Sequence, residues 1–183
     1  MIADVFKRNR SEPRLAAAVI IAVVGAAALL GAWFFQYVIG LAPCPLCLEQ
    51  RVPYYFAIPL AVMIALGVSY GAKPRVLQFG LLAIAAGMLW NAYLGVYHAG
   101  IEWKWWTGTE ACAGGVPNFR AQPDILDRIG RTAIVRCDEA PWRFLGLSLA
   151  GYNVLISLGL TATALWGALG GRARGYGSSS VSQ

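Results

Sequence analysis

Charged residues are scarce in this chain, and four long stretches contain none. Charged side chains make up 13% of the 183 residues, whereas hydrophobic side chains make up 58% and the mean hydropathy is +0.56. This apolar share exceeds that of an ordinary soluble domain. The uncharged stretches are Leu15–Leu48, Val52–Ala72, Val76–Ile101 and Phe144–Gly171. Each can cross a hydrocarbon core of about 30 Å as an α-helix, and a helix satisfies its own backbone polar groups inside lipid.

Histidine and cysteine are also sparse. The single histidine is His98, which excludes a haem held by two histidines, and no glycine-rich nucleotide fingerprint is present. The four cysteines form two pairs of different spacing. Cys44-Pro45-Leu46-Cys47 is a tight CxxC motif, whereas Cys112 and Cys137 are about 25 positions apart. A CxxC motif is typical of a redox or metal site, and a second pair would give it a partner for electron exchange.

The uncharged stretches predict an all-α integral membrane protein, a four-transmembrane-helix bundle that forms a single membrane domain over residues 1–183. An even number of spans puts both tails on one side of the membrane and both cysteine-bearing loops on the other. The expected helices are roughly 15–41, 52–71, 76–98 and 144–170, with loops at 42–51 and 99–143 and tails at 1–14 and 171–183.

The charge distribution indicates which side is which. The tails and the short loop around residues 73–75 hold eight basic residues and two acidic ones, and the basic residues crowd close to the helix ends. The opposite side holds seven of each sign. By the positive-inside rule the tails are cytoplasmic, and the cysteines lie in an oxidising compartment where disulfides persist. The net charge of +6 is a topology signal, so no nucleic-acid partner is predicted.

The long third loop contains two interfacial signals. Within Asp124–Val135, apolar residues fall on one side at helical spacing and charged residues fall on the other. This pattern predicts a short amphipathic helix that lies in the bilayer interface or packs against the bundle. Aromatic side chains favour the interface, and the loop is flanked by Trp103, Trp105, Trp106 and Trp142.

The CxxC motif is well placed for redox chemistry at the membrane surface. Cys44 and Cys47 come just before the second helix, whose positive dipole end favours a thiolate. Arg51 follows Cys47 by four residues and adds a fixed positive charge. A quinone is the natural electron acceptor, because it dissolves in the bilayer and takes two electrons, as many as a dithiol releases. Arg51 and His98 are the candidate quinone-binding residues; the alternatives are an arginine that snorkels to headgroups and a structural histidine.

Two other interpretations of the cysteines remain open at this point. Four cysteines could hold a structural zinc, but the second pair lacks the short spacing of such sites, so no metal is predicted. Both pairs could instead be inert structural disulfides. A CxxC disulfide closes a short, strained loop, which suits a purely structural task poorly.

Several motifs resemble the DsbB family of inner-membrane thiol oxidases, and the similarity extends over nearly the whole chain, from Trp33 to the end of the fourth stretch. The motifs are specific in combination, because CxxC alone is common. They are Trp33-Phe34-Phe35-Gln36, the CxxC motif with Arg51, Tyr97-His98, the Cys112/Cys137 pair, and Trp142-Arg143-Phe144-Leu145-Gly146-Leu147.

The resemblance implies a role for each cysteine. Cys44–Cys47 would be the disulfide whose electrons pass to ubiquinone, or to menaquinone in some members, with Cys47 contacting the quinone as a thiolate beside Arg51. Cys112–Cys137 would oxidise DsbA, a periplasmic thioredoxin-like protein. Cys112 would form the mixed disulfide with DsbA, and Cys137 would exchange with Cys44. The protein would lie in the bacterial inner membrane and support disulfide bond formation in secreted proteins.

The chain departs from the family just before Cys112, where Thr107–Ala111 lack the proline and phenylalanine found in some members. A paralogue that serves a dedicated substrate oxidase is therefore an alternative. Two further alternatives lie outside the family. A vitamin K epoxide reductase-like protein also couples CxxC to quinone, but its CxxC comes late in the bundle, whereas here it is early. A non-enzymatic membrane protein with structural disulfides is the other.

Overall fold

Each predicted span is a long α-helix in the computed structural model, which describes residues 13–108 and 137–176 and the side chains up to residue 170. The helices are α2 (Pro13–Tyr37), α4 (Val52–Ser69), α5 (Pro74–Glu102) and α7 (Leu149–Tyr176). A short helix, α3 (Pro45–Glu49), leads into α4. All four long segments are apolar enough to cross a membrane. The predicted all-α, four-helix membrane architecture is therefore confirmed.

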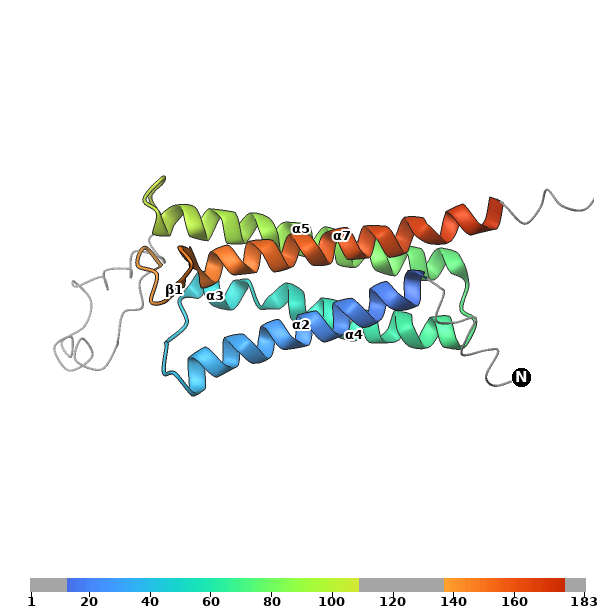
Figure 1. Ribbon diagram of the computed structural model, residues 1–183, viewed down its shortest axis with the longest axis horizontal. Coiled ribbons are helices and arrows are strands. Elements are labelled where there is room, and N and C mark those ends of the chain that lie inside the picture. Colours follow the sequence, from blue (N-terminus) through green and yellow to red (C-terminus); the bar gives the residue numbers. More distant parts are fainter. Residues whose placement is uncertain (1–12, 109–136, 177–183) are drawn as a thin grey trace, which may run out of the picture.

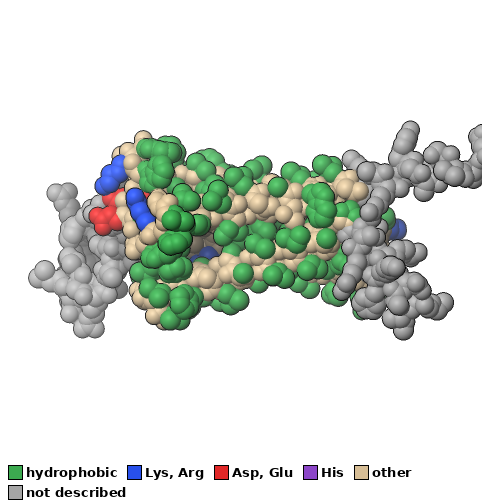
Figure 2. All heavy atoms as spheres, in the orientation of Figure 1, with side chains coloured by type: hydrophobic (Ala, Val, Ile, Leu, Met, Phe, Trp, Pro, Cys, Tyr) green, Lys and Arg blue, Asp and Glu red, His purple; other side chains and the backbone are tan. Residues whose placement is uncertain are grey.

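The helices form one elongated bundle (Figure 1). Helix α5 packs most extensively against α7, and α2 packs against both α4 and α7. The start of α2, the α4–α5 connection and the end of α7 lie at one end, whereas α3 and the start of α7 lie at the other. Hydrophobic side chains cover the visible flank of the bundle between these ends (Figure 2). Such a surface suits lipid on the outside.

Small residues allow the helices to approach closely. A Cβ atom added to Gly95 of α5 would lie 2.7 Å from Val154 Cγ2 of α7, and one added to Gly167 of α7 would lie 2.5 Å from Ala17 Cβ of α2. Close backbone approach of this kind is a main source of helix association in lipid, where the hydrophobic effect is weak. The small-residue contacts therefore fix how the helices are rotated against one another.

Helix α7 begins later than the sequence predicts. The expected start at residue 144 is wrong, because residues 143–148 form a small antiparallel hairpin of β1 (Arg143–Phe144) and β2 (Leu147–Ser148). Its two-residue turn has positive φ at both Leu145 (49°) and Gly146 (83°). Positive φ at both central positions is the mark of a type I′ hairpin turn, and it cannot continue into a helix. Helix α7 starts at Leu149.

The other helix ends differ by a few residues. Helix α2 ends at Tyr37, four residues before the expected end, and Gly40 has a φ of +82°. Helix α5 continues to Glu102, four residues beyond the expected end, so that one extra turn follows His98. The predicted amphipathic helix at Asp124–Val135 lies outside the described residues, as does Cys112.

Candidate functional site

The CxxC motif forms the first turn of α3. Cys44 is the N-cap residue, and its Sγ accepts a hydrogen bond from the Cys47 backbone N–H at 3.2 Å. Pro45, the first helical residue, has no N–H to leave unpaired, which suits this position. The two Sγ atoms lie 2.7 Å apart. Cys44 is buried and Cys47 is half-buried, so Cys47 is the more accessible sulfur.

The second cysteine pair reaches the same place through Cys137. Cys137 is 1% exposed and belongs to a small buried cluster with Cys44, Leu46 and Ile101. Cys47 and Tyr97 pack against this cluster. Cys137, which follows Cys47 by 90 positions, thus lies beside the CxxC motif. The even number of spans predicted that the two cysteine-bearing loops would share this end of the bundle.

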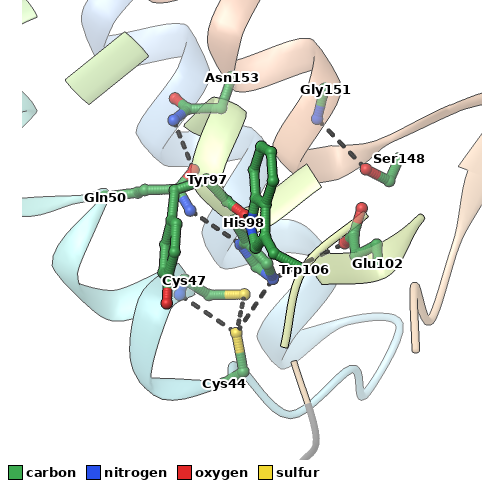
Figure 3. Close-up of polar contacts among 10 residues, drawn as sticks. All are labelled: Cys44, Cys47, Gln50, Tyr97, His98, Glu102, Trp106, Ser148, Gly151 and Asn153. Carbon is green, nitrogen blue, oxygen red and sulfur yellow. Dashed lines mark hydrogen bonds and ion pairs between the residues drawn. The ribbon is translucent and has the colours of Figure 1, made fainter. Parts of the chain in front are cut away.

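His98 lies against the CxxC motif from α5. Its Nε2 atom is 3.6 Å from Cys44 Sγ, and its Nδ1 atom is 2.8 Å from Nε2 of Gln50 (Figure 3). The ring is 3% exposed. The sequence suggested a histidine that faces a quinone, and the structure adds a direct contact with the Cys44 sulfur.

The environment of Cys44 favours the thiol. The hydrogen bond with the Cys47 sulfur, followed by burial, raises the pKa of Cys44 above its ordinary value. When the pair is reduced, Cys44 therefore holds its proton. Its Sγ keeps the hydrogen bond from the Cys47 backbone N–H, and a second donor would stabilise a thiolate on Cys44 further.

Arg51 lies between α3 and α4, at the N-cap of α4. Its Nη1 atom donates a hydrogen bond to Oε1 of Gln36 on α2, at 2.6 Å. The guanidinium group thus points toward a neighbouring helix, and it is held in place by a side chain that the sequence analysis did not select. Gln36 belongs to the Trp33–Gln36 motif, and as a polar residue in an apolar span it carried a usable signal.

A cavity of about 650 Å³ opens beside the CxxC motif. Cys44, Cys47, Arg51 and His98 all contribute to its lining. Figure 2 shows a hollow between the helices in which blue atoms of a basic side chain are visible. The remaining wall is mainly apolar and includes Val24, Ala28, Ala32, Phe35, Leu149 and Ile156.

Aromatic residues from the hairpin close one side of the cavity. The Trp142 ring lies 5.0 Å from Phe35, between ring centroids, and stacks on Phe144 at 5.9 Å. The sequence analysis treated Trp142 as an interfacial anchor, whereas here it contributes to the cavity wall. Trp103, Trp105 and Trp106 are exposed, as an interfacial role requires.

Behind His98 lies a buried network of amides and hydroxyls. Asn153 of α7 donates from Nδ2 to Oε1 of Gln50 at 2.6 Å, and Tyr54 donates from its hydroxyl to Asn153 Oδ1 at 2.7 Å. Asn91 of α5 donates to Asn153 Oδ1 at 3.3 Å and to Ser157 at 3.0 Å. The sequence-based predictions did not include this network. Polar residues inside apolar spans are rare and often functional, so Asn91 and Asn153 carried a usable signal, whereas Gln50 lies in the predicted loop between two charged residues.

Glu102 is a further residue that sequence reasoning missed. Its carboxylate lies one helical turn after His98, with Oε1 3.7 Å from Nε2. The residue is buried, and Oε2 has no hydrogen-bond partner among the described residues. Two acceptors therefore lie near Nε2 of His98, the Glu102 carboxylate and the Cys44 sulfur.

The site also bears on the zinc interpretation. Ligand atoms of Cys44, Cys47 and His98 lie within 4.8 Å of one another. A metal would require a lone pair on Nε2 of His98, the nitrogen that faces the sulfurs. The Gln50 atom that lies 2.8 Å from Nδ1 is the amide nitrogen, which can only donate, so in the neutral ring Nε2 carries the hydrogen. In this arrangement His98 is a hydrogen-bond donor and offers no lone pair to an ion.

A four-helix membrane bundle that brings a CxxC motif and a distant cysteine together beside an apolar cavity defines the class: an integral membrane thiol–disulfide oxidoreductase. The comparisons with known proteins agree. The family model described as "Disulfide bond formation protein DsbB" matches residues 13–167, and the chain belongs to this family. No solved structure gives a significant match.

Three relatives, each named "Disulfide bond formation protein B", illustrate the similarity. The protein from Polaromonas sp. is 30% identical over 144 residues, which cover 72% of this chain and 77% of the relative. The protein from Paracidovorax citrulli is 31% identical over 152 residues, 78% of this chain and 79% of the relative. The protein from Albidiferax ferrireducens is 30% identical over 158 residues, which cover 81% of this chain and 82% of the relative. Membership in this family leaves the vitamin K epoxide reductase-like and non-enzymatic alternatives without support.

Proposed function

We propose that this protein reoxidises a DsbA-like thiol oxidase and passes the electrons to a membrane quinone. The observation that carries the proposal is the burial of Cys137 against Cys44, beside an apolar cavity that Cys47 lines. The cysteine cluster suits exchange between the two pairs, and the cavity suits an apolar acceptor.

In the proposed reaction, electrons enter through Cys112. A thiolate of the partner attacks Cys112, breaks the Cys112–Cys137 disulfide and leaves a thiolate on Cys137. That thiolate attacks Cys44, breaks the Cys44–Cys47 disulfide and leaves a thiolate on Cys47. The second thiolate of the partner then attacks its own mixed disulfide and releases the partner oxidised. Cys112 returns to attack Cys137, which restores their disulfide and releases Cys44, so two electrons now reside on Cys44 and Cys47.

The cavity fits a quinone head group. Its volume of about 650 Å³ lies within the range of small-molecule sites, and its wall is mainly apolar with a few polar groups. Arg51 would bind a ring oxygen, its guanidinium being held by Gln36, and Phe35 and Trp142 would flank the ring. A bound quinone supplies an acceptor of two electrons and two protons. Ubiquinone and menaquinone both satisfy this chemistry.

The proposal places the protein in the bacterial inner membrane, with both termini in the cytoplasm and the cysteines in the periplasm. The excess of basic residues around the tails supports this orientation. An oxidising compartment around the cysteines is also what a disulfide-generating enzyme requires.

The decisive experiment is quinone reduction by the purified full-length protein on addition of a reduced DsbA-like protein, followed by quinone absorbance. We expect Cys44→Ser to abolish turnover, because Cys44 receives the electrons from Cys137. Thr161→Val is the matched control: Thr161 is buried in α7, and within the described part of the chain its hydroxyl donates to the backbone carbonyl of Ser157. Full turnover in Cys44→Ser would refute the relay.

A further inference from the structure

In the buried amide network, the hydrogen-bond donors point from Asn153 through Gln50 to His98. Asn153 Nδ2 donates to Oε1 of Gln50, and Gln50 therefore presents its NH₂ group to Nδ1 of His98 at 2.8 Å (Figure 3). Asn153 is held in this orientation because its Oδ1 atom accepts from Tyr54 and from Asn91. Both amide atoms of Gln50 and of Asn153 have partners in this orientation, so the donors run in one direction from Asn153 to His98.

This direction determines which nitrogen of His98 carries the ring hydrogen. An amide NH₂ group can only donate, so Nδ1 must accept. In a neutral imidazole the other nitrogen then carries the hydrogen. Nε2 is that nitrogen, and it lies 3.6 Å from Cys44 Sγ and 3.7 Å from Glu102 Oε1.

We propose that Gln50, oriented by Asn153, is a positioning residue that fixes His98 in the tautomer with its hydrogen on Nε2, and that this N–H stabilises the Cys44 sulfur as a thiolate. The proposal rests on the proposed function in one respect, because the proposed relay makes Cys44 a leaving group. When Cys112 attacks Cys137, the electron pair of the breaking S–S bond goes to Cys44. The Nε2–H group donates a hydrogen bond to that sulfur, and no proton needs to transfer.

The Cys47 backbone N–H already donates to Cys44 Sγ, and the groups around His98 show where a second donor can come from. The Cys47 sulfur is a hydrogen-bond partner of the Cys44 sulfur. When Cys47 is a thiolate in the same cycle, however, it has no proton to donate. Glu102 on the same helix is an acceptor, with Oε1 3.7 Å from Nε2. Arg51 bonds to Gln36, and Arg143 lies near enough to Glu102 to interact electrostatically. The His98 ring is thus a side-chain donor placed at the Cys44 sulfur, in addition to the Cys47 backbone N–H.

The tautomer can be measured directly because His98 is the only histidine in the chain. Full-length protein labelled with nitrogen-15 histidine and purified on a tag without histidine gives the ring nitrogens of one residue. We expect the couplings between ring nitrogens and ring carbon-bound hydrogens to show a protonated Nε2 and a bare Nδ1 at neutral pH. A hydrogen on Nδ1, or a doubly protonated ring, overturns the proposal without any variant and irrespective of enzyme activity.

Gln50→Glu tests whether Gln50 sets the tautomer. The new carboxylate accepts instead of donating, so Nδ1 should acquire a hydrogen. Asn153→Asp should act the same way from one residue further back, because Gln50 must rotate its NH₂ group toward the new acceptor. Thr161→Val, a buried polar change outside the network, should leave the ring signals unchanged. A bare Nδ1 in both network variants overturns the role of Gln50.

The effect on Cys44 is read from the pH profile of its alkylation. In a background with Cys47→Ala, Cys112→Ser and Cys137→Ser, Cys44 is the single thiol. His98→Leu should then move the midpoint of iodoacetamide alkylation upward by about one pH unit or more, the size expected for one lost hydrogen bond to a charged group. His98→Gln, which keeps an N–H donor, should restore part of the shift. An unchanged midpoint in His98→Leu overturns the proposal even if quinone reduction confirms the proposed function.

Discussion

At the scale of single residues, the two sulfurs of the CxxC motif have different surroundings. Cys44 is buried against Cys137 and His98, whereas Cys47 is more accessible and lines the cavity. In the proposed relay, Cys44 would receive the electrons from Cys137, and Cys47 would pass them to the acceptor. The spacing of CxxC predicted a redox pair, but it could not assign these tasks, because both residues have the same chemistry and differ only in their neighbours.

The raised pKa of Cys44 gives a first prediction. Its largest cause is the hydrogen bond with Cys47, so the reduced wild-type protein should have little thiolate on Cys44 at neutral pH. Cys47→Ala removes that bond, and the pKa of Cys44 should fall toward its ordinary value. We expect faster alkylation of Cys44 in Cys47→Ala than in the reduced wild type, measured by mass spectrometry at neutral pH. Equal rates would contradict this account of the pKa.

Arg51 gives a second prediction. A hydrogen bond to a charged group contributes about 1.5–3 kcal/mol, so Arg51→Ala should raise the KM for quinone by roughly tenfold or more. Gln36→Leu should have a smaller effect, because it removes the partner of Arg51 and leaves the positive charge in place. Initial rates at varied quinone concentration separate the two. An unchanged KM in Arg51→Ala would exclude the residue from the quinone site.

At the scale of elements, helix contacts in this bundle depend on glycine. Gly95 and Gly87 are both in α5, but only Gly95 faces another helix closely, 2.7 Å from a Val154 methyl group for an added Cβ; Gly87 has nothing within 4 Å. We expect Gly95→Ala to destabilise the bundle by about 1–3 kcal/mol through overpacking. Gly87→Ala should be neutral or stabilising, because alanine is the better helix former. Thermal unfolding followed by circular dichroism distinguishes the pair, and equal stability would refute the contact.

The hairpin before α7 shows what the sequence could not reveal at this scale. The uncharged run from Phe144 onward has no polar residue to mark a helix start before Ser148. Only the positive φ of Leu145 and Gly146 shows that the chain turns there first. A leucine at positive φ is uncommon, so no local propensity predicts it. The turn places Trp142 against Phe35 and so helps to form the cavity.

At the scale of the whole molecule, the convergence of the two cysteine-bearing loops is directly testable. In a Cys47→Ala, Cys112→Ala variant, only Cys44 and Cys137 remain, and their shared cluster should let them form a disulfide on mild oxidation. Peptide mapping without reductant should detect this disulfide. In the matched Cys44→Ala, Cys112→Ala variant, pairing of Cys47 with Cys137 should be slower, because Cys47 lies at the edge of the cluster. Two free thiols in the first variant would contradict the observed packing.

The sequence predicted the number of spans, a shared side for the two cysteine loops and a redox role for the CxxC motif. Long apolar runs specify transmembrane helices, and an even count specifies which loops meet. Only the tertiary structure decided that Gln50, His98 and Asn153 meet beside Cys44, across separations of 48 and 103 positions. The helices are apolar on nearly all sides, so periodicity does not reveal which face turns inward. That choice depends on close contacts such as Gly95 against Val154, which exist only once the helices pack.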